Sequence, residues 1–147
     1  MRFEYSNNIH CTKEEAWALI TDLERRPEWI HFQEKCYWLD QKPGMVGSTF
    51  QEKEVFLGFH MNVNYKVTAW KEYQQMTARC DMPPFHQTVD VVVRDNNNGT
   101  VYCALIIEAK MGVLGLLPKS LIKNRVDAIV QPMVDKFKEI LEAETKL

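Results

Sequence analysis

The sequence lacks any uninterrupted apolar run that approaches the roughly 20 residues needed to span a lipid bilayer. Its first fifteen residues, MRFEYSNNIHCTKEE, also contain no apolar core of the kind found in secretory leaders. We therefore expect a cytoplasmic protein that makes no stable membrane insertion.

Motifs that hold metals, phosphates or activated nucleophiles are missing as well. The four cysteines, at positions 11, 36, 80 and 103, form no C-x-x-C pair, and the four histidines show no H-x-H or H-E-x-x-H spacing. There is also no glycine-rich phosphate loop and no nucleophile elbow. The sequence therefore predicts no metal site, no cofactor and no assignable catalytic residue.

A surplus of positive charge is lacking too, because 18 basic and 20 acidic side chains give a formal net charge of -2. This balance does not favour nucleic acid as a partner. What is present is the composition of a globular protein, with 46% hydrophobic and 26% charged residues. A chain of 147 residues is long enough for one hydrophobic core and too short to suggest two. We expect residues 1–147 to form a single domain.

Two kinds of periodicity divide the chain. Alternation in residues 3–9 predicts an opening strand, and the T-x-x-E capping box at Thr12 predicts a helix after it. Pro27 suits a first helical turn and predicts a second short helix that carries Trp29. Period two then predicts six further strands near 35–40, 47–56, 59–70, 73–81, 86–95 and 100–110, separated by turn residues such as Pro83-Pro84 and Asn96-Asn97-Asn98-Gly99.

The last segment has a helical period and predicts one long amphipathic helix over Lys119–Glu144. An antiparallel sheet of six or seven strands has one face to bury, and this helix is the main element that can cover it. A single helix is only about 10 Å across, so it cannot fill the concave side of a wide, curved sheet. The remaining gap is either packed with side chains or left as a cavity.

Three short segments resemble a known superfamily. Residues 21–29 read TDLERRPEW, residues 42–48 read KPGMVGS, and Gly99-Thr100 opens the last predicted strand. They resemble, in turn, the D-x-x-x-x-P-x-W connection between two short helices, the glycine-containing hairpin and the last-strand entry of the START-like, or SRPBCC, superfamily. Polyketide cyclase/dehydrase-type proteins belong to that superfamily. The resemblance implies an α+β helix-grip fold, a curved antiparallel sheet wrapped around the long terminal helix. It also implies an apolar cavity, since members bind lipids, sterols, quinones or polyketides, and a few are enzymes.

Parity and side-chain type select the residues expected to line this cavity. Met61, Val63, Tyr65 and Val67 share one face of the strand near 59–70, whereas the strand near 100–110 is apolar on both faces and its inward face is undecided. Flexible thioethers and aromatic rings suit an adaptable apolar pocket, although a solid core explains them equally well. The predicted cavity residues are Met61, Val63, Tyr65, Val67, Met76, Arg79, Val126, Ile129, Met133 and Phe137.

Polar side chains on the strands allow two interpretations. Arg79 and Asp90 either pair across the surface or point inward, and an inward Arg79 predicts a carboxylate or phosphate partner. His60 or His86 acting with Tyr65 would suit proton transfer, but a solvent-facing histidine is the more common case. Glu52 and Glu54 alternate with Gln51 and Lys53, which predicts a solvated strand face.

The stretch KMGVLGLLPKSLIK, residues 110–123, places apolar side chains on a predicted connection. In a helix-grip fold this connection borders the cavity, so the resemblance implies a mouth formed by Val113, Leu114, Leu116 and Leu117. Two glycines in the same stretch would allow it to move as a gate. Packing under the start of the helix, or a homodimer contact, remains the alternative.

Three functions are consistent with these observations. The leading hypothesis is a non-enzymatic binder or carrier of a lipid, quinone or polyketide-like molecule. The alternative is a cyclase- or hydratase-like enzyme that acts on a polyketide or aromatic substrate, which requires an ionisable group inside the cavity. The third is a protein- or membrane-interaction module that uses the apolar mouth and the last strand.

Overall fold

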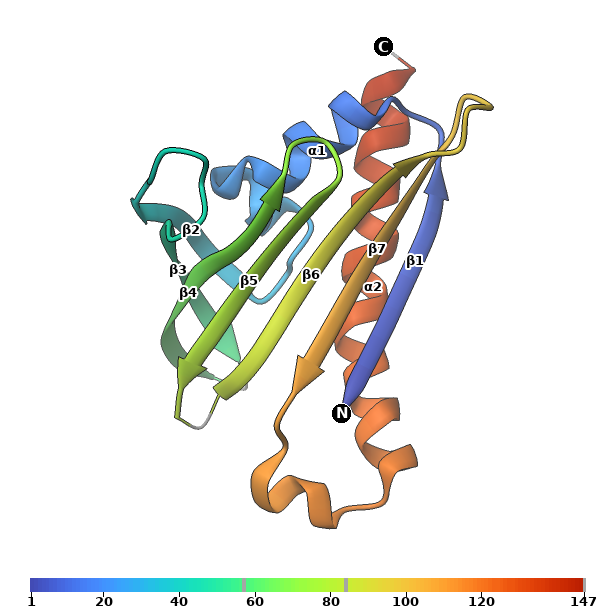
Figure 1. Cartoon of the computed structure of the whole chain (residues 1–147). Helices are drawn as coiled ribbons and strands as arrows, with labels where there is room; N and C mark the ends of the chain where they lie inside the picture. The colour runs from blue at the N-terminus through green and yellow to red at the C-terminus, as the bar shows by residue number, and fades with distance from the viewer. Residues whose placement is uncertain (57, 84, 147) are drawn as a thin grey trace.

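Seven antiparallel strands form one sheet in the computed structural model, which describes residues 1–56, 58–83 and 85–146 (Figure 1). The order across the sheet is β1-β7-β6-β5-β4-β3-β2. All strands except β1 therefore follow one another as a meander, and β1 closes the far side against β7. The bounds are β1 (Arg2–Ile9), β2 (Gln33–Asp40), β3 (Thr49–Phe56), β4 (Phe59–Lys71), β5 (Gln75–Met82), β6 (Phe85–Asp95) and β7 (Val101–Ala109).

Side-chain alternation sets which face of the sheet is buried. On β4 the odd positions from 61 to 69 are buried or half-buried and the even positions between them are exposed, as the sequence pattern predicts. On β7 the structure resolves the undecided parity, because Leu105 and Ile107 face the interior. β7 is apolar on both faces for most of its length because it is an internal strand, paired with β1 on one side and β6 on the other.

The described residues also form four helical segments: α1 (Lys13–Thr21), the 3-10 helix η1 (Leu23–Glu28), the 3-10 helix η2 (Gly112–Leu116) and α2 (Lys119–Thr145). The predicted capping box is present, since the Thr12 hydroxyl accepts from the Glu15 amide and the Glu15 carboxylate accepts from the Thr12 amide. The prediction that Pro27 begins the second helix is wrong. Pro27 lies near the end of η1, and Trp29 is the residue that caps it.

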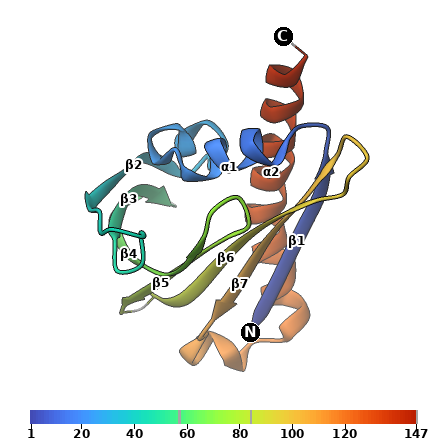
Figure 2. The ribbon, with the colours of Figure 1, turned by 45° about the horizontal axis from the view of Figure 1, so that its top comes forward.

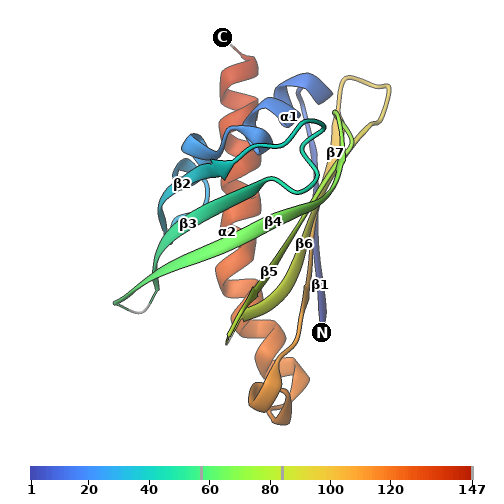
Figure 3. The same ribbon diagram turned by 60° about the vertical axis from the view of Figure 1, so that its left-hand side comes forward.

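The helices lie on the concave side of the sheet. Figure 2 shows α1 and η1 across one end of the sheet, and Figure 3 shows α2 running along the concave face from η2 to the opposite end. This arrangement is the predicted α+β helix-grip fold. Within the described residues, none of these helices is long and apolar enough to cross a bilayer.

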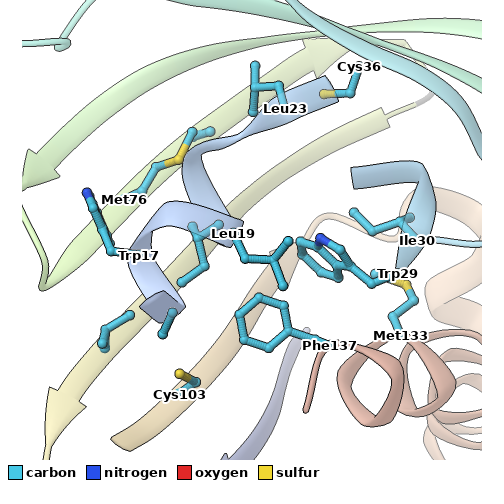
Figure 4. Packing of buried hydrophobic residues seen from close by; sticks show 14 of the residues in the cluster. Trp17, Leu19, Leu23, Trp29, Ile30, Cys36, Met76, Cys103, Met133 and Phe137 are labelled. Atoms are coloured by element: carbon cyan, nitrogen blue, oxygen red, sulfur yellow. The ribbon is translucent and has the colours of Figure 1, made fainter. Parts of the chain in front are cut away.

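The larger hydrophobic cluster lies where α1, η1 and the second half of α2 meet the sheet. Trp29 and Phe137 make an edge-to-face contact with ring centroids 5.0 Å apart, and Met133 and Ile30 lie beside Trp29 (Figure 4). Trp17 makes a similar contact with Trp70 of β4 at 5.2 Å. Such aromatic pairs contribute about 0.5–1.5 kcal/mol beyond the burial of their area. The core therefore holds the helices at one end of the sheet, and the space toward η2 is left to a cavity.

Candidate functional site

A cavity of about 820 Å³ lies between the concave face of the sheet, η1 and α2. This volume is within the range of small-molecule sites in proteins. Its wall is mainly aliphatic and aromatic, and includes Ala78, Val89 and Val91 from the middle strands. The sheet and the single helix thus do not close on each other completely.

Seven of the predicted cavity residues lie on this wall: Met61, Val63, Tyr65, Met76, Val126, Ile129 and Met133. The first four come from β4 and β5, and the last three come from one face of α2. Their convergence follows from the two periodicities in the sequence. A period of two on the strands and a helical period on α2 select the faces that meet across the cavity.

The other three predicted cavity residues lie elsewhere. Val67 is 1% exposed in the packed core, and Phe137 lies against Trp29 and borders a second pocket of only about 30 Å³. The prediction for Arg79 is wrong, because its side chain is 54% exposed and its Nε donates to Asp81 at 2.6 Å. Arg79 is an odd residue on β5, where even residues such as Met76 point inward. Asp90 also lies on the outer face, where it accepts a hydrogen bond from Gln75.

The predicted mouth is divided between two environments. Val113 and Leu114 border the cavity at the η2 end, together with Lys110 and Met111. Leu116 and Leu117 are exposed, with Leu116 at 89%, and neither lies on the cavity wall. The segment forms a short 3-10 helix that begins at Gly112, whose φ of +54° lies in the left-handed region that glycine adopts readily.

Two carboxyl groups on the cavity wall overturn the prediction of a solvated face on β3. Glu52 is 6% exposed and Glu54 is half-buried, and both line the cavity. Their parity is that of Phe50, which is 1% exposed. The sequence contained this signal, because Phe50 and Phe56 bracket the two glutamates at even spacing.

Arg26 of η1 is the cation that accompanies these carboxyl groups. Its Nη1 lies 3.6 Å from Oε1 of Glu52, and both side chains are 8% exposed. The guanidinium also donates to the carbonyl oxygen of Ile20 at 3.2 Å and lies over the ring of Phe50, 5.2 Å from its centroid. No sequence pattern distinguishes Arg26 from its neighbour Arg25, whose side chain is 32% exposed and pairs with Glu28 and Glu144. Only the turn of η1 places one arginine inside and the other outside.

The proton on Glu54 is held by its surroundings. Burial, the hydrogen bond to Glu52 and the charge of Glu52 together raise the pKa of Glu54 to about 9. Glu54 is therefore an uncharged acid at neutral pH, while Glu52 pairs with Arg26. The cavity wall holds one acid proton and one balanced ion pair.

Tyr65 adds a second protonated group. Burial, reinforced by Glu52 and Glu54, raises the pKa of Tyr65 well above its ordinary value, and the side-chain amide of Gln87 donates to its hydroxyl oxygen. The histidines do not accompany it in the way considered from the sequence. His60 is exposed, and His86 borders the cavity but has Nδ1 3.5 Å from Asp81 at the surface.

The comparisons with known proteins agree with this fold. Residues 1–142 match the family model described as polyketide cyclase / dehydrase and lipid transport. The chain belongs to this family. Among curated proteins, none matches the sequence.

Solved structures show the same fold at low sequence identity. A START superfamily protein from Mycobacterium smegmatis superimposes with a TM-score of 0.79 at 13% identity, over 97% of each chain. The Polyketide_cyc-like protein Cgl2372 from Corynebacterium glutamicum gives 0.67 at 21% identity, over 98% of this chain and 93% of its own. The di-domain ARO/CYC protein StfQ of the steffimycin biosynthetic pathway gives 0.73 at 14% identity, over 98% of this chain and 46% of its own. This family member is therefore START-like in fold.

Proposed function

We propose that this family member binds or carries a hydrophobic small molecule, such as a lipid, quinone or polyketide-like compound, in its cavity. The observation that supports this proposal is the volume of about 820 Å³ behind a mainly apolar wall. Burying about 300 Å² of apolar ligand surface supplies on the order of 7 kcal/mol before ordering costs, which corresponds to micromolar affinity at best.

The mouth segment supports exchange of the ligand with the outside. Val113 and Leu114 contact the cavity at one end of η2, and Leu116 is exposed at the other. An apolar guest that passes this segment stays in contact with aliphatic side chains. A carrier requires such a route for its ligand, whereas a protein with a solid core and no ligand does not.

Met133 of α2 provides the test of the cavity as a binding site. Met133→Glu places a carboxylate on the apolar wall, so we expect it to abolish titration of the neutral fluorescent probe N-phenyl-1-naphthylamine. Met133→Leu has a similar volume and is the matched control that keeps binding. Circular dichroism establishes that both variants are folded. Unchanged probe binding by a folded Met133→Glu protein contradicts the proposal.

A second candidate function is a cyclase-like activity, and the observation that favours it is that two weak acids, Glu54 and Tyr65, line the same cavity. A protonated carboxyl can donate its proton to a substrate carbonyl oxygen while the enol carbon of the same substrate forms the ring bond, and the enol hydroxyl proton returns to the carboxylate. The carboxyl then gives this proton to the new hydroxyl group, which leaves as water while the carboxylate takes up the neighbouring C–H proton. Burial, together with the neighbouring Glu52, raises the pKa of Glu54 and so favours its protonated form at neutral pH.

The cyclase candidate is tested with heptane-2,4,6-trione, which closes to 5-methylresorcinol with loss of one water. We expect faster product formation with the wild-type protein than with Glu54→Gln, because the amide keeps the shape and has no acid proton to transfer. Chromatography measures the product. Equal rates for the wild type, Glu54→Gln and buffer argue against catalysis and leave the binding proposal standing.

A further inference from the structure

The turn between β6 and β7 contains the one asparagine of the sequence that precedes a glycine, Asn98. Every other asparagine precedes a larger residue. Asn98 and Gly99 are both exposed, and the φ of Gly99 is +85°. None of residues 96–100 lies on the cavity wall, so the turn takes no part in the proposed binding function.

The backbone nitrogen of Gly99 is the first reactive group of this turn. An asparagine reacts with its own chain when the amide nitrogen of the next residue adds to the side-chain carbonyl carbon, Cγ. A side chain on that next residue obstructs the approach, and glycine has none. A Cβ atom placed on Gly99 would have no atom of a non-adjacent residue within 4 Å. The described fold therefore adds no steric obstacle on this side of Gly99.

Thr100 supplies two hydrogen-bond donors to the side-chain carbonyl oxygen of Asn98. Its amide nitrogen donates to Oδ1 at 3.1 Å, and its hydroxyl donates to the same atom at 2.5 Å. The amide donor identifies that atom as the oxygen of the side chain and not the nitrogen. Negative charge collects on this oxygen when a nucleophile adds to Cγ, so donors that are already in place lower the barrier to addition.

Asn96 fixes the direction of the Thr100 hydroxyl. Its side-chain amide donates to Oγ1 of Thr100 at 3.0 Å and to Oδ1 of Asn8 at 2.9 Å. Because an NH2 group only donates, the hydroxyl proton of Thr100 is left to point at Asn98, and the two hydrogen bonds polarise each other. Nδ2 of Asn98 has no hydrogen-bond partner among the described residues, so the group that must leave is not held.

We propose that this turn is a self-modification site, in which the folded chain assists conversion of Asn98 to aspartate and isoaspartate through a cyclic imide. Hydroxide takes the amide proton of Gly99, and the nitrogen bonds to Cγ of Asn98 while negative charge moves to Oδ1. The carbonyl then re-forms, the Cγ–Nδ2 bond breaks, and Nδ2 leaves as ammonia with a proton from water, which regenerates hydroxide. Water adds to one of the two ring carbonyl carbons and opens the imide. No group is oxidised or reduced.

The modification changes both the charge and the backbone at this end of the sheet. Each product carries a new carboxylate close in sequence to Asp95. Isoaspartate also adds a methylene group to the main chain, inside the turn that the Asn96 amide closes on the carbonyl oxygen of Thr100 at 3.1 Å. We therefore expect the isoaspartate form to unfold at a lower temperature than the unmodified protein.

Ageing of the whole protein at pH 8 and 37 °C tests the proposal. Peptide mapping by mass spectrometry separates asparagine, imide, aspartate and isoaspartate at each position. Asn97 is the internal control, because it is exposed in the same turn and precedes an asparagine. We expect Asn98 to react about tenfold faster than Asn97, because only Asn98 is followed by a residue without a side chain. Its rate in the native protein should equal or exceed its rate in protein unfolded with guanidinium chloride.

Two variants of Thr100 test the assistance by the turn. Thr100→Val removes the hydroxyl donor and keeps the shape of the side chain, whereas Thr100→Ser keeps the hydroxyl. We expect Thr100→Val to lower the native rate about three- to tenfold, less than the loss of a buried oxyanion donor because this turn is exposed. Its rate in the unfolded chain should change little, and Thr100→Ser should retain most of the native rate. Circular dichroism establishes that both variants are folded.

Three results would overturn the proposal. A native rate well below the unfolded rate would show that the hydrogen bonds from Thr100 hold the side chain away from reaction. A native rate that Thr100→Val leaves unchanged would show that the hydroxyl gives no assistance, and an Asn98 that stays as intact as Asn97 would show that there is no site. None of these results bears on the proposed binding function, because aged and fresh protein should titrate N-phenyl-1-naphthylamine equally.

Discussion

Arg26 and Glu52 form an ion pair inside a small domain, and each depends on the other. Removing one partner leaves a buried charge without compensation, whereas replacing both with apolar residues is often tolerated. We expect Glu52→Leu to lower the free energy of unfolding by about 3 kcal/mol. The double variant Arg26→Met/Glu52→Leu should lie within about 1 kcal/mol of the wild type. Urea denaturation of the two proteins measures this, and equal losses in both would show that the pair is not coupled.

Glu54 makes the stability of the protein depend on pH. The folded protein keeps the Glu54 proton up to about pH 9, whereas the unfolded chain releases it near its ordinary pKa of about 4.3. The folded state therefore binds more protons between these values, so the contribution of Glu54 to the free energy of unfolding falls as pH rises and levels off above about pH 9.

Glu54→Gln removes this dependence. Relative to the wild type, we expect it to gain on the order of 1 kcal/mol between pH 5 and pH 8, a value discounted because the side chain is only half-buried. Urea denaturation at the two pH values provides the measurement. The exposed Glu34 of β2 supplies the control, since Glu34→Gln should follow the wild-type slope. A Glu54→Gln protein with that same slope would contradict the assignment.

The individual polar residues were the part of the site least accessible from sequence. Parity places Met61, Val63 and Tyr65 on the buried face of β4, because the apolar side chains of a half-buried strand share one face. At Glu52 the parity with Phe50 is outweighed by residue type, because a glutamate is almost never buried without a partner and the partner, Arg26, lies in a different element. The prediction for Arg79 was wrong for another reason. Its strand is correctly predicted, but the even residues of that strand, and not the odd ones, point toward the cavity.

At the scale of elements, the segment from η2 to the start of α2 combines exposed aliphatic side chains with positive charge. Val113, Leu114, Leu116 and Leu121 are each more than 40% exposed. Residues 110–126 contain four cations, Lys110, Lys119, Lys123 and Arg125, and no acidic residue. Such a combination suits reversible contact with an anionic lipid surface, where basic residues are attracted and apolar residues enter the interface.

Vesicles test this interaction hypothesis. We expect weak co-sedimentation with vesicles that contain phosphatidylserine, decreasing several-fold between 50 and 300 mM salt, and little with phosphatidylcholine alone. Leu114→Ser/Leu116→Ser should reduce it severalfold. The control Leu39→Ser/Val46→Ser removes two aliphatic residues outside this segment that are each about half exposed, and it should have no effect. A protein indifferent to both vesicle types would leave the segment a cavity mouth only.

The elements themselves were largely predictable, and the errors have local causes. Turn residues and the change of period locate every strand to within two residues, with Pro84 of the predicted Pro83-Pro84 turn outside the described residues. Pro27 misled because proline is accommodated in the short η1 helix as well as at a helix start. The mouth was expected as an open connection, but it forms the short helix η2.

For the whole molecule, the proposed binding function depends on a mismatch between two shapes. A curved seven-stranded sheet is wider than the single helix α2 that lies on it, and α1 and η1 fill only one end of the difference. The sequence predicts this gap from element order and helix width. It does not predict whether side chains fill it, because that depends on the relative curvature of strands far apart in the chain.

Stability and binding should therefore oppose each other across the cavity. Val89 and Val92 lie on the same strand, but Val89 lines the cavity and Val92 has the opposite parity and is not among its lining residues. Val89→Phe fills part of the space, so we expect an unfolding temperature equal to or higher than that of the ligand-free wild type. We also expect binding of N-phenyl-1-naphthylamine to weaken at least tenfold, because the added ring occupies volume that the guest requires.

Val92→Phe adds the same ring to the outer face and should leave the affinity unchanged. Calorimetry and probe titration on both variants measure the two quantities. Full binding by Val89→Phe would mean that the guest does not use the space beneath β6.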